Sequence, residues 1–510
     1  MNHNKLKSIE KIYETTLNKA NVYFKANDID SCLNSLELAA TIAWICPFKP
    51  LFGDDLIENI LLKISNNLIF KKYQESNRIL LYCTSTRDFG ALVQQYLYNL
   101  PNVTLIVHEQ VSEYENFEIL NYLKNEQIEF HVLEKKRPFI DKIKSLEYLI
   151  QKIKPIKIFL HLDPNDVFAA TYFIKLKKLT YFINHGDHLF WIGRNSFENI
   201  IEFRSYGFWF SKNIRKLKNV KYYVIPFYPI LPKNKFDTNL NFNEGSIIGV
   251  SGGNLYKYNQ DPDLIFFKII IRLLKKNKNF FFILCGKGNS KRIEKLVRKE
   301  NIGDRFKIYG FRRDFSEIIK KSHIYFNSYP VGGGLSLMYA LYHKVPIVSV
   351  IEKVRNGDSL EEVFEIPTYK SLESIGDMEE FANQLINYKL FRQNIINSQL
   401  SKTFNINKFK ELLTEIIEDK AITKKTVISE HYTFDFDLNL KNSINENGTF
   451  NNVIYWAFIF NIKNAGFYKR VLEYLNTIKS LKKPDLRLIL KIHIIFFGLR
   501  KFIVQIRNDK

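Results

Sequence analysis

Two histidines and an aspartate surround a single glycine in the segment 184–193, NHGDHLFWIG. A histidine or a carboxylate that titrates near neutral pH can take the proton of a hydroxyl group, as a general base must. Asp187 is the first candidate for this role and His188 the second. His185 is expected to orient a phosphate or the acceptor, which is the molecule that carries the hydroxyl group. Two alternatives stay open: a zinc site, for which no further ligand is evident, and a purely structural polar turn.

A second group of residues is suited to phosphate. The segment 327–350, NSYPVGGGLSLMYALYHKVPIVSV, carries Gly332, Gly333 and Gly334 before a helix-compatible run at 335–342. Glycines in this position let backbone N–H groups approach a phosphate, and the helix N-terminus adds favourable potential. Ordinary loop punctuation is the alternative explanation.

A lysine follows two small residues near the middle of the chain. The apolar strand predicted at 246–251 runs into Gly252 and Gly253, which leave room for a diphosphate, and Lys257 would neutralise it. Transfer of a sugar from a nucleoside diphosphate puts negative charge on the leaving group. A fixed cation and backbone donors stabilise that charge without a metal. A surface lysine in a polar loop is the alternative.

Further donor contacts are predicted at the next strand ends. The strand predicted at 280–285 ends in Gly286, whose small size again leaves room for a ligand. The turn 309–314, YGFRRD, resembles the turn that commonly holds the nucleotide base through backbone groups in two-lobed transferases, which implies Phe311 or Arg312 as the wall of the base site. A plain turn between a strand and a helix is the alternative.

Two carboxylates have roles that stay open. Asp358 stands in the sequence GDS after a predicted strand, where it is expected to cap a helix and to touch the donor. Asp163 follows the strand predicted at 156–162, where it caps a helix or lines the acceptor side.

The elements that would position these residues alternate between short apolar runs and helices. Such alternation is typical of parallel, doubly wound sheets, in which ligands bind beyond the carboxyl ends of the strands. The Pro- and Asn-rich segment 226–243 divides two such runs. We therefore predict an α/β fold with two Rossmann-like domains, at 76–235 and 244–420, between a helical N-terminal region at 1–75 and a C-terminal extension at 421–510. Strands are predicted at 78–83, 103–107, 130–133, 156–162, 180–184, 200–203 and 222–225, and then at 246–251, 280–285, 306–308, 324–327 and 346–350.

The C-terminal extension ends in a basic amphipathic pattern. Arg487, Lys491, Lys501 and Gln505 share one face of a helix, and most apolar residues lie elsewhere on it. A helix of this kind lies in a membrane interface. Packing against its own protein is the alternative.

Composition narrows the class of protein. The chain has 510 residues and a formal net charge of +22, spread along its length rather than gathered in one block. This distribution argues against nucleic acid and suits a membrane surface or an anionic sugar phosphate better. The four cysteines form no CxxC pair, and neither a signal peptide nor an uncharged membrane span is evident. The expected location is the cytoplasm, with a peripheral position on the inner face of the cell membrane as an alternative.

The segment 247–350 resembles the donor lobe of GT-B glycosyltransferases, in which two Rossmann-like domains face each other. Within that class it is most similar to glycosyltransferase family 41, the protein O-GlcNAc transferases and their bacterial relatives. The match rests on the sequence NLYK, followed by Asp261 and Pro262, and on the Gly-rich loop. The resemblance implies that Lys257 contacts the donor diphosphate and that Ser336 supplies the hydroxyl group of the phosphate loop.

The first domain carries two weaker similarities. The segment 84–90, TSTRDFG, resembles the Asp-Phe-Gly turn of family 41, which would place Asp88 on the acceptor side, although Leu92 replaces the family histidine. The histidine-rich segment around Asp187 resembles the His-x-Asp-His-x-x-Trp-x-Gly segment of bacterial GT-B enzymes.

The Gly-rich loop departs from both patterns. Gly334 and Leu335 replace the His and the first Thr of family 41. The large retaining family of this architecture has a Glu-x7-Glu pair, at whose positions Val331 and Tyr339 stand here. A retaining mechanism of that type is therefore disfavoured, and inversion is favoured.

Together these residues predict a metal-independent GT-B glycosyltransferase with no cofactor. Its co-substrate would be a UDP- or GDP-sugar, and its acceptor a glycan, a lipid-linked glycan or a protein, in bacterial surface polysaccharide or glycoconjugate synthesis. The rival hypothesis is a non-catalytic scaffold or partner subunit that keeps the fold but lacks turnover.

Overall fold

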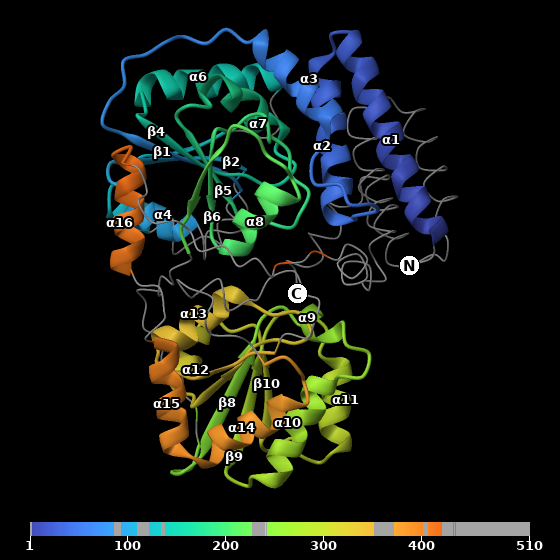
Figure 1. Cartoon of the computed structure of the whole chain (residues 1–510), viewed down its shortest axis with the longest axis vertical. Coiled ribbons are helices and arrows are strands. Elements are labelled where there is room, and N and C mark those ends of the chain that lie inside the picture. Colours follow the sequence, from blue (N-terminus) through green and yellow to red (C-terminus); the bar gives the residue numbers. More distant parts are fainter. Residues whose placement is uncertain are drawn as a thin grey trace, which may run out of the picture.

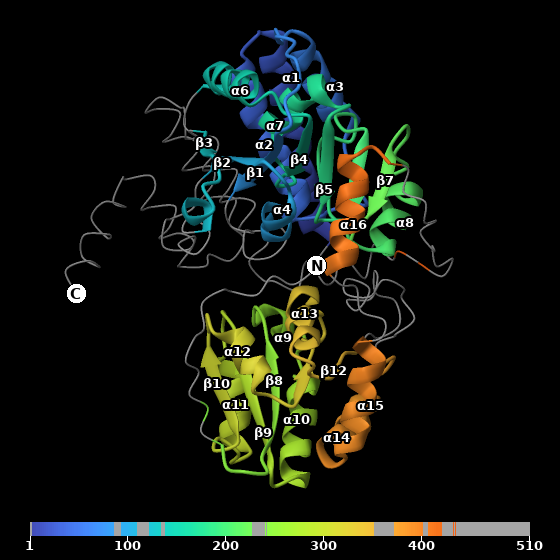
Figure 2. The same cartoon turned by 90° about the vertical axis from the view of Figure 1, so that its left-hand side faces the viewer.

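The computed structural model describes residues 3–85, 93–109, 122–133, 138–226, 242–350, 372–400 and 406–420, together with positions 240, 432 and 434. Two lobes lie one above the other along the long axis of the molecule, and each is built on a parallel sheet with helices against its faces (Figure 1). The view turned by 90° shows the same arrangement, with one lobe above the other (Figure 2). The predicted α/β class with two Rossmann-like domains is confirmed.

The first lobe contains a sheet of seven parallel strands in the order β3-β2-β1-β4-β5-β6-β7. Its central strands β1, β4 and β5 are almost wholly buried, as expected where helices cover both faces of a parallel sheet. The strand order reverses at β1, which pairs with both β2 and β4. The strands are β1 Ile79–Ser85, β2 Val103–Glu109, β3 Phe130–Val132, β4 Lys157–His161, β5 Thr180–Asn184, β6 Asn199–Glu202 and β7 Lys221–Val224, and the helices are α4 Gln94–Asn99, α6 Phe139–Ile153, α7 Val167–Phe173, the 3-10 helix η3 Ile174–Leu176 and α8 Ser205–Asn213.

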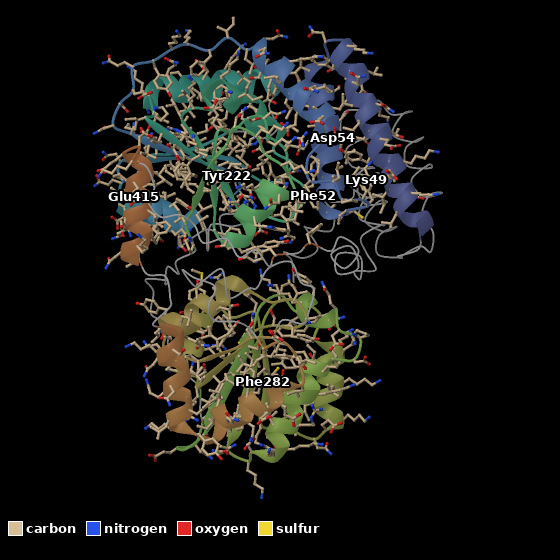
Figure 3. The ribbon with its side chains drawn as sticks, viewed as in Figure 1. Lys49, Phe52, Asp54, Tyr222, Phe282 and Glu415 are labelled. Atoms are coloured by element: carbon tan, nitrogen blue, oxygen red, sulfur yellow. The ribbon has the colours of Figure 1, made fainter. Side chains whose placement is uncertain are left out.

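The second lobe contains five parallel strands in the order β10-β9-β8-β11-β12. Its order reverses at β8, which pairs with both β9 and β11, and ligands of such sheets bind beyond this point. Phe282 of β9 lies in the core of this lobe (Figure 3). The strands are β8 Ile247–Gly252, β9 Phe280–Cys285, β10 Phe306–Gly310, β11 Ile324–Phe326 and β12 Ile347–Val348, and the helices are α9 Tyr256–Asn259, α10 Ile265–Lys276, α11 Lys291–Lys299, α12 Phe315–Lys320, α13 Gly334–Tyr342, α14 Asp377–Asn387 and α15 Lys389–Leu400.

Three N-terminal helices, α1 His3–Lys25, α2 Ile29–Ile45 and α3 Asp55–Asn66, pack against the first lobe. Their buried apolar residues share one continuous core with those of β4, α6 and α7. Asp54 caps α3 by accepting hydrogen bonds from the backbone of the first turn, which fixes where this helix begins. The N-terminal region is therefore part of the first lobe's structure.

The last described helix, α16 Ile406–Ile417, packs back on the first lobe. The ring of Phe409 lies 5.6 Å from that of Tyr96 in α4, and Lys157 of β4 forms an ion pair with Asp419 just beyond α16. This helix lies inside the range 244–420 that the sequence suggested for the second domain, but its apolar face is buried against the first. Sequence periodicity shows which face of a helix is apolar and not which sheet covers it.

The basic helix predicted near the C-terminus lies outside the described residues. None of the helices in the described ranges is both long enough and apolar enough to cross a membrane.

Candidate functional site

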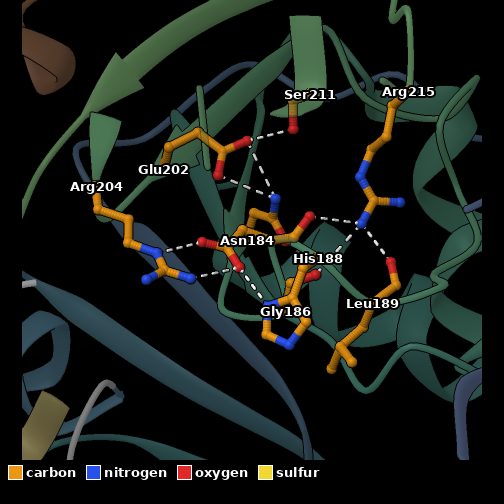
Figure 4. Close-up of polar contacts among 9 residues, drawn as sticks. Asn184, Gly186, His188, Leu189, Glu202, Arg204, Ser211 and Arg215 are labelled. Atoms are coloured by element: carbon orange, nitrogen blue, oxygen red, sulfur yellow. Dashed lines mark hydrogen bonds and ion pairs between the residues drawn. The ribbon is translucent and has the colours of Figure 1, made fainter. Parts of the chain in front are cut away.

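The carboxyl end of β5 carries a buried network of charged side chains (Figure 4). Asp187 is 1% exposed, and Arg204 donates to its two carboxylate oxygens, with Nε 2.5 Å from Oδ2 and Nη2 3.0 Å from Oδ1. His188 Nδ1 lies 2.8 Å from Asp187 Oδ1. Burial alone would raise the pKa of Asp187, but the Arg204 guanidinium and the hydrogen bond with His188 outweigh it and hold that pKa well below its ordinary value.

This environment does not suit Asp187 to the role of base that the sequence suggested. A buried carboxylate with a lowered pKa and two hydrogen bonds from a guanidinium is a weak proton acceptor. His188 is the better candidate because its side chain is 37% exposed and its Nδ1 is engaged by the carboxylate. With the proton on Nδ1, the lone pair of Nε2 is left for chemistry. The contact with Nδ1 places the Asp187 carboxylate where it can orient the ring.

Backbone carbonyl groups of the same loop are held by a buried guanidinium. Arg215, which follows α8, donates from Nη2 to the carbonyl oxygens of Gly186 at 3.3 Å and Asp187 at 2.9 Å, and also to that of Leu189. Its guanidinium also lies 4.6 Å from the centre of the Trp191 ring. These contacts fix the path of the loop on both sides of His188.

A buried glutamate holds the start of the loop. Glu202, at the end of β6, accepts from Asn184 Nδ2 at 3.0 and 3.1 Å and from Ser211 Oγ at 2.6 Å. Burial raises the pKa of Glu202 to about 7, although these hydrogen bonds act in the opposite direction. Helix α8 presses closely on the network, since a Cβ at Gly207 would lie 2.5 Å from Glu202 Oε2 and 3.1 Å from Asp187 Cβ.

The end of the loop is held by the N-terminal helices. Glu58 of α3 is fully buried and accepts backbone hydrogen bonds from Gly193 at 2.7 Å, Arg194 at 3.2 Å and Asn195 at 3.3 Å. Burial raises the pKa of this carboxyl group to about 7, against the effect of those bonds. Sequence reasoning missed this contact because 135 residues separate Glu58 from Gly193.

His185 has a different surrounding from His188. Its ring stacks on that of His161 at the end of β4, with centroids 4.3 Å apart and an angle of 18° between the planes. Burial, and then the neighbouring His185, hold the pKa of His161 well below its ordinary value. The orienting role predicted for His185 is untested.

Of the two carboxylates predicted on the acceptor side, Asp163 lies in the described part of the first lobe. The backbone N–H of Asp163 donates to Thr84 Oγ1 at 2.9 Å, and Thr84 in turn donates to Asp166 Oδ2 at 2.6 Å. Asp166, and not Asp163, caps α7, because its carboxylate accepts from the backbone of Ala169. Asp163 is half-buried and stays a candidate for the acceptor side. Asp88 lies outside the described residues.

In the second lobe, the structure brings the predicted lysine and the glycine loop together. Lys257 Nζ donates to the carbonyl oxygen of Gly332 at 3.0 Å. A Cβ on Gly333 would lie 3.2 Å from Lys257 Nζ and 3.2 Å from Ser336 Oγ, so both polar groups border the same glycine. Figures 1 and 2 place α9 and α13 at the end of the second lobe that faces the first.

The N-terminus of α13 begins at glycines. Gly333 is its N-cap, and a glycine has no side chain that could cap the first N–H groups of the helix. Asn327, directly after β11, fixes the loop because its Oδ1 accepts from the backbone N–H groups of Ser328 and Gly333, both at 3.0 Å. This arrangement can bind an anion.

The other predicted glycines serve different purposes. A Cβ on Gly286 would lie 1.8 Å from the carbonyl oxygen of Gly253. The ends of β8 and β9 can therefore come this close only because residue 286 is a glycine. Gly252 faces the ring of Phe315, so packing against this ring, and not a ligand, accounts for a glycine at this position. Gly253 has φ +145° and open space around its Cβ position, which suits a loop that lies against a ligand.

The turn after β10 presents an aromatic surface. Phe311 is 58% exposed, and Lys287 Nζ lies 4.5 Å from its ring centre. Arg312 is paired with Asp314, with Nε 2.7 Å from Oδ1, so it would serve as a wall through its stem. Asp358 lies outside the described residues. No cluster of three or more potential metal ligands occurs in the ranges that the structure describes.

Comparison with a protein family extends this picture. Residues 233–355 match the model of the family described as glycosyl transferases group 1. The match includes Lys257, the Gly-rich loop and the turn with Phe311. It supports a group 1 glycosyltransferase and gives family 41 no support of its own. A search of curated proteins found no significant match.

Solved structures share the architecture at low sequence identity. The structure of a glycosyltransferase from Rickettsia africae covers 68% of this chain and 100% of its own, with 12% identity and a TM-score of 0.50. Alr3699/HepE of Anabaena in complex with UDP and glucose covers 67% and 100%, with 15% identity and a TM-score of 0.46. A UDP-N-acetylglucosamine 2-epimerase covers 68% and 95%, with 13% identity and a TM-score of 0.46. The fold is GT-B, with two Rossmann-like lobes as in the glycosyltransferase from Rickettsia africae.

Proposed function

We propose that the chain is a glycosyltransferase that moves a sugar from a UDP- or GDP-sugar to the hydroxyl group of an acceptor. The observation that carries this proposal is the contact between Lys257 and the Gly-rich loop at the N-terminus of α13. Both elements lie inside the range 233–355 that matches group 1 glycosyltransferases. A cation beside the N-terminus of a helix is suited to a diphosphate.

The donor would react at the second lobe. As the bond between the anomeric carbon and the diphosphate oxygen breaks, its electron pair passes to the nucleoside diphosphate. Lys257, the first N–H groups of α13 and the hydroxyl group of Ser336 stabilise the resulting charge. Phe311 would stack on or border the base, and Gly253 and Gly286 leave the diphosphate room.

The acceptor would be activated at the first lobe. Its hydroxyl oxygen bonds to the anomeric carbon and its proton passes to His188 Nε2. Asp187 orients the ring and stabilises the imidazolium that forms, and Arg204 keeps Asp187 ionised. A single displacement of this kind inverts the anomeric configuration. Val331 and Tyr339 are consistent with it, because neither can act as the carboxylate of a Glu pair.

A glycan, lipid-linked or protein hydroxyl group fits the chemistry, and bacterial surface polysaccharide or glycoconjugate synthesis is the setting we favour. The net charge of +22 suits a cytoplasmic protein that visits the anionic inner face of the cell membrane.

The test is nucleoside diphosphate release by the purified protein with a panel of UDP- and GDP-sugars, with and without each acceptor class, and with and without EDTA. We expect acceptor-stimulated release that EDTA leaves unchanged. Donor binding without release in any combination would support the partner-subunit hypothesis. Inhibition by EDTA would show that a metal ion takes part.

A further inference from the structure

Two aromatic residues of the C-terminal extension lie on the first lobe. Tyr432 and Phe434 are two positions apart, the spacing that puts side chains of an extended segment on one face. The rest of the extension lies outside the described residues. These two side chains alone therefore show where this part of the chain is held.

The surface beneath them is formed by α8 and by the loop before α3. The Tyr432 ring lies 5.5 Å from that of Tyr206 and 5.8 Å from that of Trp209. The Phe434 ring lies 5.1 Å from that of Phe210, at 86° to it, and 5.3 Å from that of Phe52, at 78°. Edge-to-face contacts at these distances are favourable geometries for aromatic pairs. Figure 3 labels Phe52 between the first lobe and the N-terminal helices.

Helix α8 contributes to this aromatic surface and also lies against the Asp187 network. The Arg204 guanidinium, at the N-cap of α8, lies 5.0 Å from the ring centre of Tyr206. Gly207, the residue after Tyr206, leaves no space for a Cβ against Asp187 and Glu202. Arg215, just after the helix, lies 5.3 Å from the ring of Phe210 and holds the carbonyl groups around His188. A shift of α8 must therefore move both guanidinium groups.

We propose that Tyr432 and Phe434 anchor the C-terminal extension on α8 and that this docking positions the Arg204–Asp187–His188 network. The occupant of the aromatic surface is thus a segment of the chain itself. Tyr432 and Phe434 act as positioning residues. They contact α8, which begins after Arg204 and ends before Arg215, and they do not contact the network itself. The catalytic consequence rests on the proposed glycosyltransferase function, whereas the docking and the effect on the loop do not.

The test compares three variants of the full-length chain. Tyr432→Ala with Phe434→Ala removes both rings, and Tyr432→Phe with Phe434→Tyr keeps both. Tyr388→Ala removes a ring that is 62% exposed in the second lobe and serves as the matched control. Amide hydrogen exchange of residues 205–213 and 186–189 reads the two steps of the proposal separately.

We expect exchange in both segments to rise by about tenfold in the double alanine variant and to stay unchanged in the other two. Where transfer is measurable, kcat should fall by about tenfold while the KM for donor stays within about twofold, because misplacement of a base affects the chemical step. Unchanged exchange in 205–213 would overturn the docking. Faster exchange in 205–213 alone, or an unchanged kcat, would overturn the positioning. A wild-type protein without transfer would contradict the proposed function but leave the exchange test in force.

Discussion

The ammonium nitrogen of Lys257 lies 3.0 Å from the carbonyl oxygen of Gly332, although 75 residues separate them in the sequence. The contact joins α9, the short helix after β8, to the loop before α13, at the point where the order of the second sheet reverses. A lysine side chain that contacts a carbonyl group beside the N-terminus of a helix is placed to reach a phosphate bound there.

Removal of this cation should weaken donor binding. Lys257→Ala is expected to raise the KM for the nucleotide sugar by about 10- to 100-fold, because a charge-assisted hydrogen bond to the diphosphate is lost. Lys268→Ala, an exposed lysine of α10, is the control and should leave that KM unchanged. Initial rates over a range of donor concentrations measure the effect. Equal KM values for the two variants would place the diphosphate elsewhere.

The revised base assignment predicts a large effect at His188. His188→Gln should lower kcat by about 10²- to 10⁴-fold with donor binding nearly intact, since the proton acceptor is removed. Donor affinity is measured separately by calorimetry. Full activity of this variant would show that another group takes the proton.

Asp187→Asn tests the orienting group. The amide keeps the shape of the side chain but no longer carries the charge that pairs with Arg204, so we expect kcat to fall while donor affinity holds. Asp263→Asn, at an exposed position, is the matched control. Because Asp187 is buried in an ion pair, the folded fraction of each variant must be compared by near-UV circular dichroism. A fully folded and fully active Asp187→Asn protein would refute the orienting role.

Glu58 predicts a distinct pH dependence of stability. Burial raises its pKa from 4.5 to about 7, so the unfolded chain ionises first as the pH rises. The contribution of Glu58 to the free energy of unfolding is fully present below about pH 4.5. It is lost as the pH rises to about 7, by about 3 kcal/mol in total. Urea unfolding of the wild type and of Glu58→Gln at pH 5, 6 and 7 measures it. The wild type should lose more stability over this interval, and a reversed difference would show that the three backbone bonds dominate.

The approach of β8 to β9 predicts a stability effect at Gly286. Gly286→Ala would place its Cβ 1.8 Å from the carbonyl oxygen of Gly253, so the backbone must shift and we expect a loss of about 1–3 kcal/mol. Gly303→Ala has no neighbouring atom within 4 Å and should be neutral. Thermal and urea unfolding compare the two variants. Equal stabilities would mean that the strand ends can separate freely.

Strand–helix alternation was enough to predict the sheets. The bounds of β5 and β9 agree with the sequence prediction, because their apolar runs are uninterrupted and flanked by polar or glycine residues. The proximity of Lys257 to the Gly-rich loop also followed, since parallel strands bring their carboxyl ends to one edge.

The distribution of roles within the histidine segment could not be predicted. Asp187 looked like a base by residue type, but its protonation is governed by Arg204, which the fold brings in from the next strand. Glu58 lies 135 residues before the turn that it holds, and no local pattern records such a contact. Periodicity and spacing describe neighbours along the chain, whereas these roles depend on neighbours in space.

The return of α16 to the first lobe means that, along the described elements, the chain passes to the second lobe between β7 and β8 and comes back between α15 and α16. A single cut in either connection would therefore leave the two lobes covalently joined through the other.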